Sequence, residues 1–158
     1  MSILQTIHQY EHDNVYFCDS IKNNVMTNGY FIRILYCMSN CTMNGIYLKM
    51  DFREVMYEKY YQKYKCHFDI DTCMEMTNHV NEIEQQLLDK ISRIVKGKTP
   101  QYKLAEQLKY GFIKLFCESP PPKHPASGLF ILKISGIWET DVNYGLTYKF
   151  SRTSCIDT

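Results

Sequence analysis

Alternation of hydrophobic and polar residues organises the first part of the chain. Residues 30–37 alternate in the manner of a half-buried strand, and residues 46–52 repeat the pattern with their apolar side chains on one face. Asn44-Gly45, directly before the second segment, is a strong hairpin signal. A further strand is indicated at 15–18, after an N-terminal stretch that suits a short helix or an arm. The pattern predicts antiparallel strands, with a hairpin between 30–37 and 46–52.

Residues 54–68 fit two structures. The tyrosines at 57, 60, 61 and 64 have the spacing of a helix face. In a strand, by contrast, one face would carry Tyr57, Lys59, Tyr61, Lys63 and Lys65. Tyrosine is abundant (13 of 158 residues) and alanine is scarce, which favours a strand. We therefore expect a strand here and keep the helix as the alternative.

One long helix is indicated between residues 72 and 96. Thr72 and Glu75 fit a capping box at its start, and Gly97 fits a left-handed cap at its end. The apolar residues of this segment recur at helical spacing. They are Val80, Ile83, Leu87, Leu88, Ile91, Ile94 and Val95. The helix therefore has one face to bury against the strands.

Three more strands are expected after the helix, at 107–117, 129–138 and 144–150. A proline-rich loop, 119–128, separates the first two, and a tight polar connection, 139–143, joins the last two. Neither an internal repeat nor a long linker divides the chain. Residues 1–158 are therefore expected to form a single domain, mainly β with one long helix.

Composition limits the class of protein more than its function. The chain carries 18 basic and 17 acidic side chains, so its net charge identifies no partner. No run approaches the roughly 20 apolar residues of a membrane span, and the N-terminus lacks the features of a signal peptide. Seven cysteines, an odd number, suit reduced thiols. We expect an intracellular protein that is neither secreted nor membrane-bound. Its abundance of Ile, Lys, Asn and Tyr is typical of an AT-rich genome, as in many large DNA viruses and some parasites, and a viral origin would place it in the host nucleus or cytoplasm.

Charge is unevenly distributed along this nearly neutral chain. Residues 69–89 hold six acids and no lysine or arginine, whereas residues 90–114 hold seven basic residues against Glu106 alone. Lysines release counterions from phosphates, and exposed aromatic rings stack on bases at roughly 1–3 kcal/mol each. The lysines and tyrosines of 57–65, together with Lys109 and Lys114, therefore predict binding of single-stranded nucleic acid. The alternative is a solvated charged face over core tyrosines.

Motifs for metal binding and catalysis are weak. Cys37 and Cys41 form one loose pair where a structural zinc site usually has two tight pairs. The other candidate ligands considered are Cys66, His67, Cys73 and His79, and we interpret the thiols as buried apolar groups. His8 and His12 could share a helix face but lack the intervening glutamate of a metalloprotease motif. Since no nucleophile elbow or phosphate-binding glycine loop is present either, we expect no metal, no cofactor and no enzymatic activity.

The segment LFILKISGIWETDVNYGLTYKF, residues 129–150, resembles the closing hairpin of small OB-fold single-stranded-DNA-binding proteins of large DNA viruses and related elements. The resemblance rests on an apolar strand, Gly136, Trp138, a polar turn and the run Gly145-Leu146-Thr147-Tyr148. It implies an OB-like antiparallel barrel, with the helix between the third and fourth barrel strands. Trp138 is expected in the core, because its strand face otherwise carries Phe130, Leu132 and Ile134.

The resemblance also implies a binding face on the second and third barrel strands. By position, this face comprises Tyr30, Arg33, Tyr36, Tyr47 and Lys49, extended by Tyr57, Lys59 and Tyr61. The resulting prediction is sequence-independent binding of single-stranded DNA, or of RNA, in replication or recombination of a viral-type genome. A homo-oligomer is compatible with the sequence. The competing prediction is a viral protein-interaction module, either a virion component or a host-factor antagonist, that binds no nucleic acid and uses its tyrosines as an interface.

Overall fold

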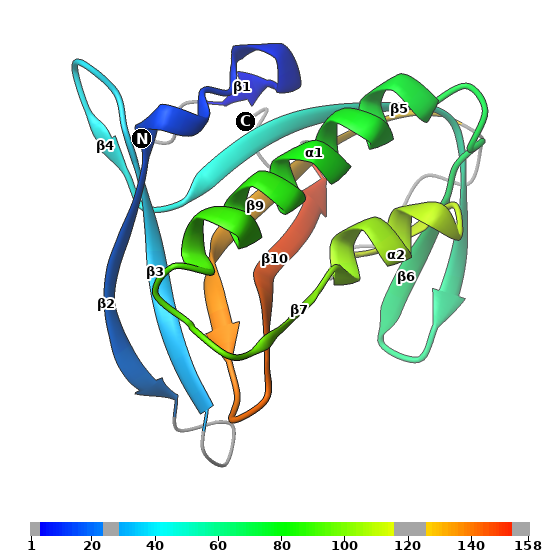
Figure 1. Ribbon diagram of the computed structural model, residues 1–158. Helices are drawn as coiled ribbons and strands as arrows, with labels where there is room; N and C mark the ends of the chain where they lie inside the picture. The colour runs from blue at the N-terminus through cyan, green and yellow to red at the C-terminus, as the bar shows by residue number, and fades with distance from the viewer. Residues whose placement is uncertain (1–3, 24–28, 116–125, 153–158) are drawn as a thin grey trace.

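Ten strands pair into one mixed sheet in the part of the chain that this computed structural model describes, residues 4–23, 29–115 and 126–152 (Figure 1). The first half contains β1 (Gln5–Thr6), the 3-10 helices η1 (Ile7–Gln9) and η2 (His12–Asn14), β2 (Val15–Asn23), β3 (Gly29–Cys37), β4 (Thr42–Met43), β5 (Ile46–Tyr60) and β6 (Lys63–His67). The second half contains α1 (Met74–Ile91), β7 (Thr99–Gln101), α2 (Lys103–Lys109), β8 (Phe112–Leu115), β9 (Ala126–Glu139) and β10 (Asn143–Arg152). The prediction of a mainly β protein with one long helix is confirmed.

β9 is the central strand of the sheet. β10 runs along one edge of β9 as its antiparallel partner, and β3 and β5 lie end to end along the other edge. β3 pairs with residues 136–139 of β9, whereas β5 pairs with residues 126–134. β2 extends the sheet beyond β3, and the far half of β5 pairs with β6, which in turn pairs with β8.

The sheet curls strongly but does not close into a barrel. β8 and β10 meet through the single pair Leu115 and Phe150, and this contact is parallel, as are those of β1 with β5 and of β7 with β10. The predicted OB-like antiparallel barrel is therefore wrong. Alternation within each strand reveals its two faces but not its neighbours, and β5 is long enough to pair with both β9 and β6.

The predicted hairpin between 30–37 and 46–52 is also wrong. β3 instead turns back onto the short strand β4, and the Met38 amide donates a hydrogen bond to the Cys41 carbonyl at 2.9 Å across that turn. Asn44-Gly45 follows β4 and leads into β5, which pairs with β9. Gly45 has a φ of +121°, and a Cβ atom there would lie 3.0 Å from the Ile134 carbonyl oxygen, so this crossing point favours glycine.

Segment 54–68 forms strands, as predicted, but it forms two of them. β5 runs to Tyr60 and β6 returns antiparallel from Lys63. The turn between them reverses the chain, so the predicted common face of Tyr57, Lys59, Tyr61, Lys63 and Lys65 is wrong. Tyr57 lies opposite the buried Cys66, whereas Lys65 belongs to the other side of the same hairpin.

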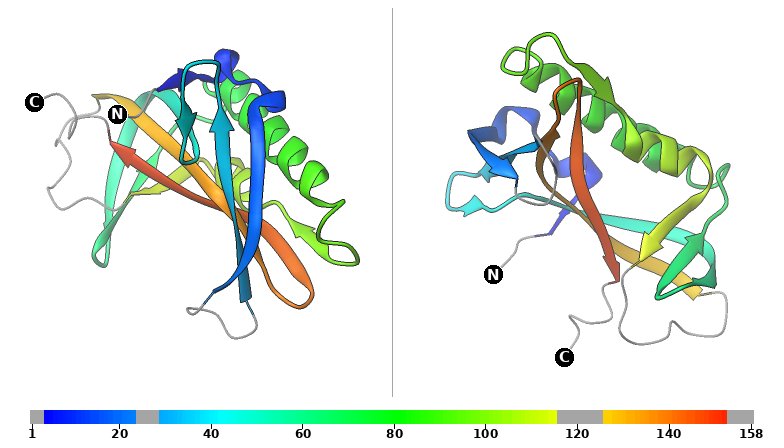
Figure 2. Two further views of the ribbon diagram at one scale, coloured as in Figure 1. Left: turned by 90° about the vertical axis from the view of Figure 1, so that its left-hand side faces the viewer. Right: turned by 90° about the horizontal axis from the view of Figure 1, so that it is seen from below.

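α1 lies across one face of the sheet (Figures 1 and 2). Its buried residues reproduce most of the predicted apolar stripe and join the core cluster, although Ile94, beyond the helix end, is 63% exposed. The helix is shorter than predicted at both ends. The Thr72 hydroxyl donates to the Asp69 carbonyl at 3.3 Å, and the residue at the helix N-cap is Cys73, which makes no side-chain cap. Gly97 has a φ of +79° but lies several residues past Ile91.

The predicted strand at 107–117 is wrong in its first part, where α2 precedes the short β8. Glu84 of α1, fully buried, explains how this short helix is stabilised. Its carboxylate accepts hydrogen bonds from the backbone amides of Leu104 at 3.0 Å and Ala105 at 2.8 Å. These amides belong to the first turn of α2, where helical donors have no partner within the helix.

The hairpin of β9 and β10 confirms the last two predicted strands and the tight connection between them, while most of the predicted proline-rich loop lies outside the described residues. A register shift leaves Ser135 unpaired in this ladder, so Ile137 faces the core and Trp138 does not, against our prediction. Trp138 is half-buried opposite Gly145, where a Cβ atom would lie 2.7 Å from its ring. In the described residues, neither α-helix has the length and apolarity needed to cross a membrane.

Candidate nucleic-acid interface

β6 brings together two segments that the sequence analysis singled out separately. It pairs with the end of β5 on one side and with β8 on the other. Lys65 is therefore flanked by Glu58 on β5 and by Lys114 on β8. Directly opposed residues point to the same face of a sheet. This face is the one turned away from the buried Cys66 and Ile113.

Lys65 is held between two aromatic rings on this outer face. Its ammonium group lies 4.4 Å from the ring centroid of Tyr60 and 4.9 Å from that of Phe112, within the range of cation–π attraction. Its other neighbour, Glu58, forms its ion-pair contact with the His67 imidazole at 2.8 Å rather than with Lys65. Among the described residues, no acidic side chain forms a salt bridge with Lys65 or Lys114.

The tip of the β5–β6 hairpin presents two further rings. Tyr61 is 82% exposed and Tyr60 is 44% exposed, and their rings meet edge to face with centroids 4.7 Å apart. Tyr61 has a φ of +56°, the only positive φ at a non-glycine residue in the described part of the chain. A turn position of this kind normally selects glycine or asparagine, because the left-handed conformation costs other residues roughly 1–2 kcal/mol.

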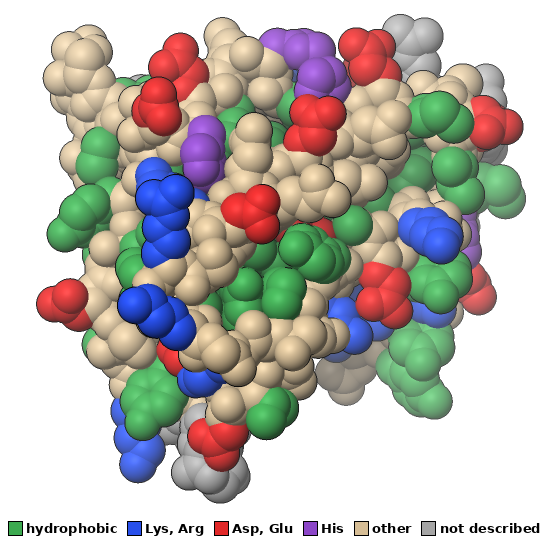
Figure 3. Space-filling model, in the orientation of Figure 1, with side chains coloured by type: hydrophobic (Ala, Val, Ile, Leu, Met, Phe, Trp, Pro, Cys, Tyr) green, Lys and Arg blue, Asp and Glu red, His purple; other side chains and the backbone are tan. Residues whose placement is uncertain are grey.

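α2 borders the same face on its other side. A hollow of about 270 Å³ lies between α2 and β8, lined by Lys103, Glu106, Gln107, Tyr110, Phe112, Lys114 and Tyr148. The Tyr148 hydroxyl donates to Gln107 Oε1 at 2.6 Å, and burial, reinforced by Glu84 and Glu106, raises the pKa of this tyrosine to about 12. We call this surface the basic-aromatic face; its members are Tyr60, Tyr61, Lys63, Lys65, Tyr110, Phe112 and Lys114. At the right of Figure 3, over α2 and the β5–β6 hairpin, hydrophobic, lysine and acidic side chains lie side by side.

Two predicted contact residues of the same segments point elsewhere. Tyr57 is half-buried, with the Arg152 guanidinium 5.8 Å from its ring centroid. Lys59 is exposed but lies opposite Tyr64, on the side of the hairpin that carries Tyr57. Lys109 is exposed on α2, where it lines a second hollow that α2 shares with α1.

The residues predicted on 30–37 and 46–52 form a separate group. Tyr36 is 2% exposed, stacks on Tyr10, and accepts a hydrogen bond from the Glu11 amide at 2.9 Å, so its ring cannot meet a base. Arg33 donates to Asn44 Oδ1 at 2.7 Å. Tyr30 and Lys49 are exposed, and Tyr47 is half-buried beneath the Lys133 ammonium, 5.3 Å from its ring centroid. β3 lies far from β6 in both Figures 1 and 2, so the two groups do not form one surface.

Part of the basic segment 90–114 stabilises the fold. Lys90 donates to the Val15 carbonyl at 2.8 Å, tying α1 to β2. Lys98 forms an ion pair with Glu139, and Lys103 lies 3.5 Å from Glu106 on the surface of α2. Lys114 is the member of this segment that joins the lysines of β6.

Among the residues that the structure describes, the cysteines considered as metal ligands belong to no group of three candidate ligands. Cys66 and Cys73 are buried, and burial raises the pKa of the Cys66 thiol to about 12. Within the described residues, the one group of three candidate metal ligands combines His8, Glu75 and His79, and sequence spacing could not have indicated it because His8 is distant in the chain.

Comparison with family models, with curated proteins and with solved structures finds no match to this chain.

Proposed function

We propose that the protein binds single-stranded DNA without sequence preference, through the basic-aromatic face. The observation that carries the proposal is the direct opposition of Lys65 and Lys114. Like charges at opposed positions of a sheet destabilise it. A phosphate group placed between the two ammonium groups would turn this repulsion into attraction and release condensed counterions.

The aromatic members supply the second requirement of single-strand binding. Tyr61 and Tyr110 are 82% and 67% exposed, so their rings are available to stack on unpaired bases. Stacking of this kind contributes roughly 1–3 kcal/mol per base and tolerates any sequence. The strained backbone of Tyr61 supports the same interpretation, because backbone strain concentrates at functional sites. A glycine at this position would relieve the strain but would have no ring to stack on a base.

The proposed site differs from the one implied by the OB-fold resemblance. It uses β6, β8 and the β5–β6 hairpin rather than β3 and the first half of β5. The resemblance of 129–150 supports the role in replication or recombination of a viral-type genome. The glycines of that segment serve packing in this fold, since Gly136 and Gly145 have no room for a Cβ atom.

Fluorescence anisotropy of a labelled oligo-dT, titrated with the full chain at low and moderate salt, tests the proposal. We expect single-strand binding that exceeds binding to a duplex of the same length and weakens steeply with salt. Failure to bind oligo-dT at low salt would refute it.

A protein-interaction module is the second candidate, and Met56 favours it. This side chain is 67% exposed and lies in the row of His67 and Phe112 on the outer face of the sheet. Exposed methionine and tyrosine are typical of protein interfaces. A partner whose binding does not depend on salt, combined with no affinity for oligo-dT, would support this function instead.

A further inference from the structure

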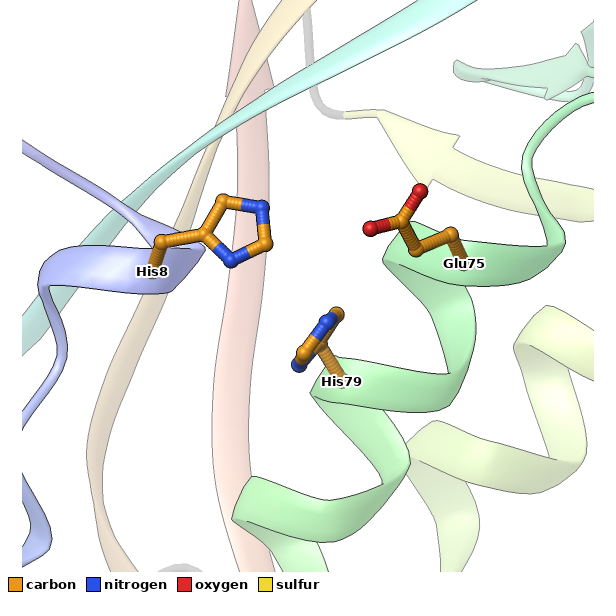
Figure 4. Close-up of side chains that lie close together, drawn as sticks. All are labelled: His8, Glu75 and His79. Atoms are coloured by element: carbon orange, nitrogen blue, oxygen red, sulfur yellow. The ribbon is translucent and has the colours of Figure 1, made fainter.

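Three potential metal ligands meet where the N-terminal segment crosses the start of α1 (Figure 4). His8 comes from η1, and Glu75 and His79 are four residues apart on α1, which places them on one face of the helix. The candidate ligand atoms all lie within 4.8 Å of one another. The rings of His8 and His79 meet edge to face at 79°, with their centroids 4.9 Å apart.

In the described part of the chain, these side chains have no competing polar partner. Among the described residues, none forms a hydrogen bond or an ion pair with His8, Glu75 or His79 in the structure. His8 and Glu75 are exposed and His79 is half-buried, so an ion can reach all three from solvent. The cluster therefore holds two imidazoles and one carboxylate whose electron pairs are available.

We propose that His8, Glu75 and His79 bind a divalent transition metal ion of the zinc class. Zn²⁺ is bound by histidine nitrogen and carboxylate oxygen at about 2.0–2.2 Å, which sets neighbouring tetrahedral ligands about 3.4 Å apart. Ligand atoms now within 4.8 Å of one another must therefore close by up to about 1.4 Å. Rotation of three side chains that are exposed or half-buried supplies such a movement.

The ligand set selects the kind of ion. Imidazole nitrogen suits zinc, cobalt, nickel and copper, whereas Mg²⁺ and Ca²⁺ require oxygen ligands. Three protein ligands leave one tetrahedral position for water. The cluster borders a hollow of about 330 Å³ that is also lined by Lys49, Asp51 and Thr72, so this position has room for water or a small anionic ligand.

Binding would have a structural consequence. η1 lies near the N-terminus, and a shared ion would fasten it to the first two turns of α1. In the described structure, neither imidazole donates its second ring N–H to a carboxylate or a carbonyl group. Loss of such a hydrogen bond from a metal-binding histidine typically lowers metal affinity 10–100-fold. We therefore expect a dissociation constant of about micromolar order, rather than the tighter binding of a structural zinc site.

Titration of the full chain with Zn²⁺ by calorimetry, and with Co²⁺ by absorption spectroscopy, tests the proposal under reducing conditions. We expect one ion per chain, a higher melting temperature with Zn²⁺ but not with Mg²⁺, and cobalt d–d bands without a thiolate charge-transfer band. His8→Ala, His79→Ala and Glu75→Gln should each weaken binding at least tenfold. The controls are His12→Ala, which removes the histidine four residues from His8, and Glu82→Gln, which removes a neighbouring exposed acid of α1; both should bind as the wild type does.

Three results would overturn the assignment. They are no saturable Zn²⁺ binding, a thiolate charge-transfer band that assigns the ion to cysteine, or variants of all three ligands that bind as tightly as the wild type. His8→Ala changes a residue of an exposed 3-10 helix, so it remains informative if a change on α1 impairs folding. None of these readouts involves nucleic acid, so they test metal binding independently of the proposed DNA binding.

Discussion

Lys65 on β6 lies directly opposite Lys114 on β8, with the Lys65 ammonium group 4.4 Å from the Tyr60 ring centroid and 4.9 Å from that of Phe112. The rings favour a cation in this place, but they do not remove the repulsion between two lysines on adjacent strands. This repulsion is the reason for proposing an anionic partner for the pair.

Lys114→Glu should separate stability from binding. The new carboxylate would face Lys65, so we expect the free energy of unfolding to rise by about 0.2–1 kcal/mol, while affinity for oligo-dT falls. Lys49→Glu makes the same change of charge at an exposed position of β5. It should leave oligo-dT affinity nearly unchanged. Equal losses of affinity in the two variants would show that the basic-aromatic face is not the binding site.

Tyr61→Gly should weaken oligo-dT binding without destabilising the protein. Glycine adopts the φ of +56° freely, so relief of backbone strain of roughly 1 kcal/mol offsets the greater entropy of the unfolded chain. Loss of the ring should cost roughly 1–3 kcal/mol of binding free energy. Tyr61→Phe keeps the ring and serves as the control. Denaturant unfolding and anisotropy measure the two effects, and a glycine variant with full affinity would exclude Tyr61 as a stacking residue.

Glu84→Gln should destabilise the protein by about 1–3 kcal/mol. The carboxylate accepts two amide hydrogen bonds at the start of α2, whereas a glutamine side chain offers one acceptor and turns an NH₂ group towards the other amide. Glu106→Gln, on the exposed side of α2, should change stability by less than about 0.5 kcal/mol. Chemical denaturation of both variants measures the difference, and similar stabilities would show that the buried carboxylate does not hold α2.

Glu84 also predicts a dependence of stability on pH. Burial raises the pKa of this carboxyl above its ordinary 4.5, although the two backbone hydrogen bonds oppose the shift. The folded state therefore binds the proton more tightly than the unfolded chain. The stabilisation that this tighter proton binding gives the folded state is fully present at pH values below the ordinary pKa. It is lost as pH rises through the folded-state pKa. The difference in unfolding free energy between the wild type and Glu84→Gln should therefore shrink as pH rises from the ordinary pKa to the folded-state pKa. A difference that grows with pH would contradict the direction of the pKa shift.

Gly136→Ala tests whether the glycine of the 129–150 segment serves packing. An added Cβ atom would lie 2.4 Å from the Ile32 carbonyl oxygen and 2.5 Å from the Phe31 ring, so we expect a loss of about 1–3 kcal/mol. Gly97→Ala meets no atom within 4 Å and should cost only the backbone strain of its positive φ, about 1 kcal/mol. Thermal unfolding compares the two, and a smaller cost at Gly136 would show that β3 can move away from β9.

Local patterns in the sequence predicted the elements better than their arrangement. Alternation identified β3 and the start of β5, the strands expected at 129–138 and 144–150 correspond to β9 and β10, and the stripe from Val80 to Ile91 identified the buried face of α1. Pairing depends on contacts between distant residues, and a single sequence does not contain that information. For this reason the predicted barrel and the predicted hairpin at Asn44-Gly45 failed.

The candidate sites show the same division. The sequence pattern indicated the lysines and tyrosines of 57–65 and the lysine at 114. The turn at Tyr61 divides the residues of 57–65 between two faces, and only the outer face of β6 lies beside Lys114. Tyr36 shares its strand face with the buried Ile32 and Ile34 and is buried with them, with Tyr10 stacked on its ring and Asn14 donating to its hydroxyl, so its placement in the binding face by the resemblance fails. In the sequence, Glu84 does not differ from the other acidic residues of the helix, because only the fold brings the first turn of α2 to its carboxylate.

The salt dependence of oligo-dT binding tests the central claim most directly. The measurement compares the wild type with the double variant Lys65→Gln, Lys114→Gln by anisotropy over a range of NaCl concentrations. Each phosphate contact to a single strand contributes about 0.7 to the slope of log K against log[salt], so loss of two contacts should reduce the slope by about 1.4 and weaken binding at every salt concentration. A double variant with the slope and affinity of the wild type, or a wild type that does not bind oligo-dT at low salt, would contradict the proposed function.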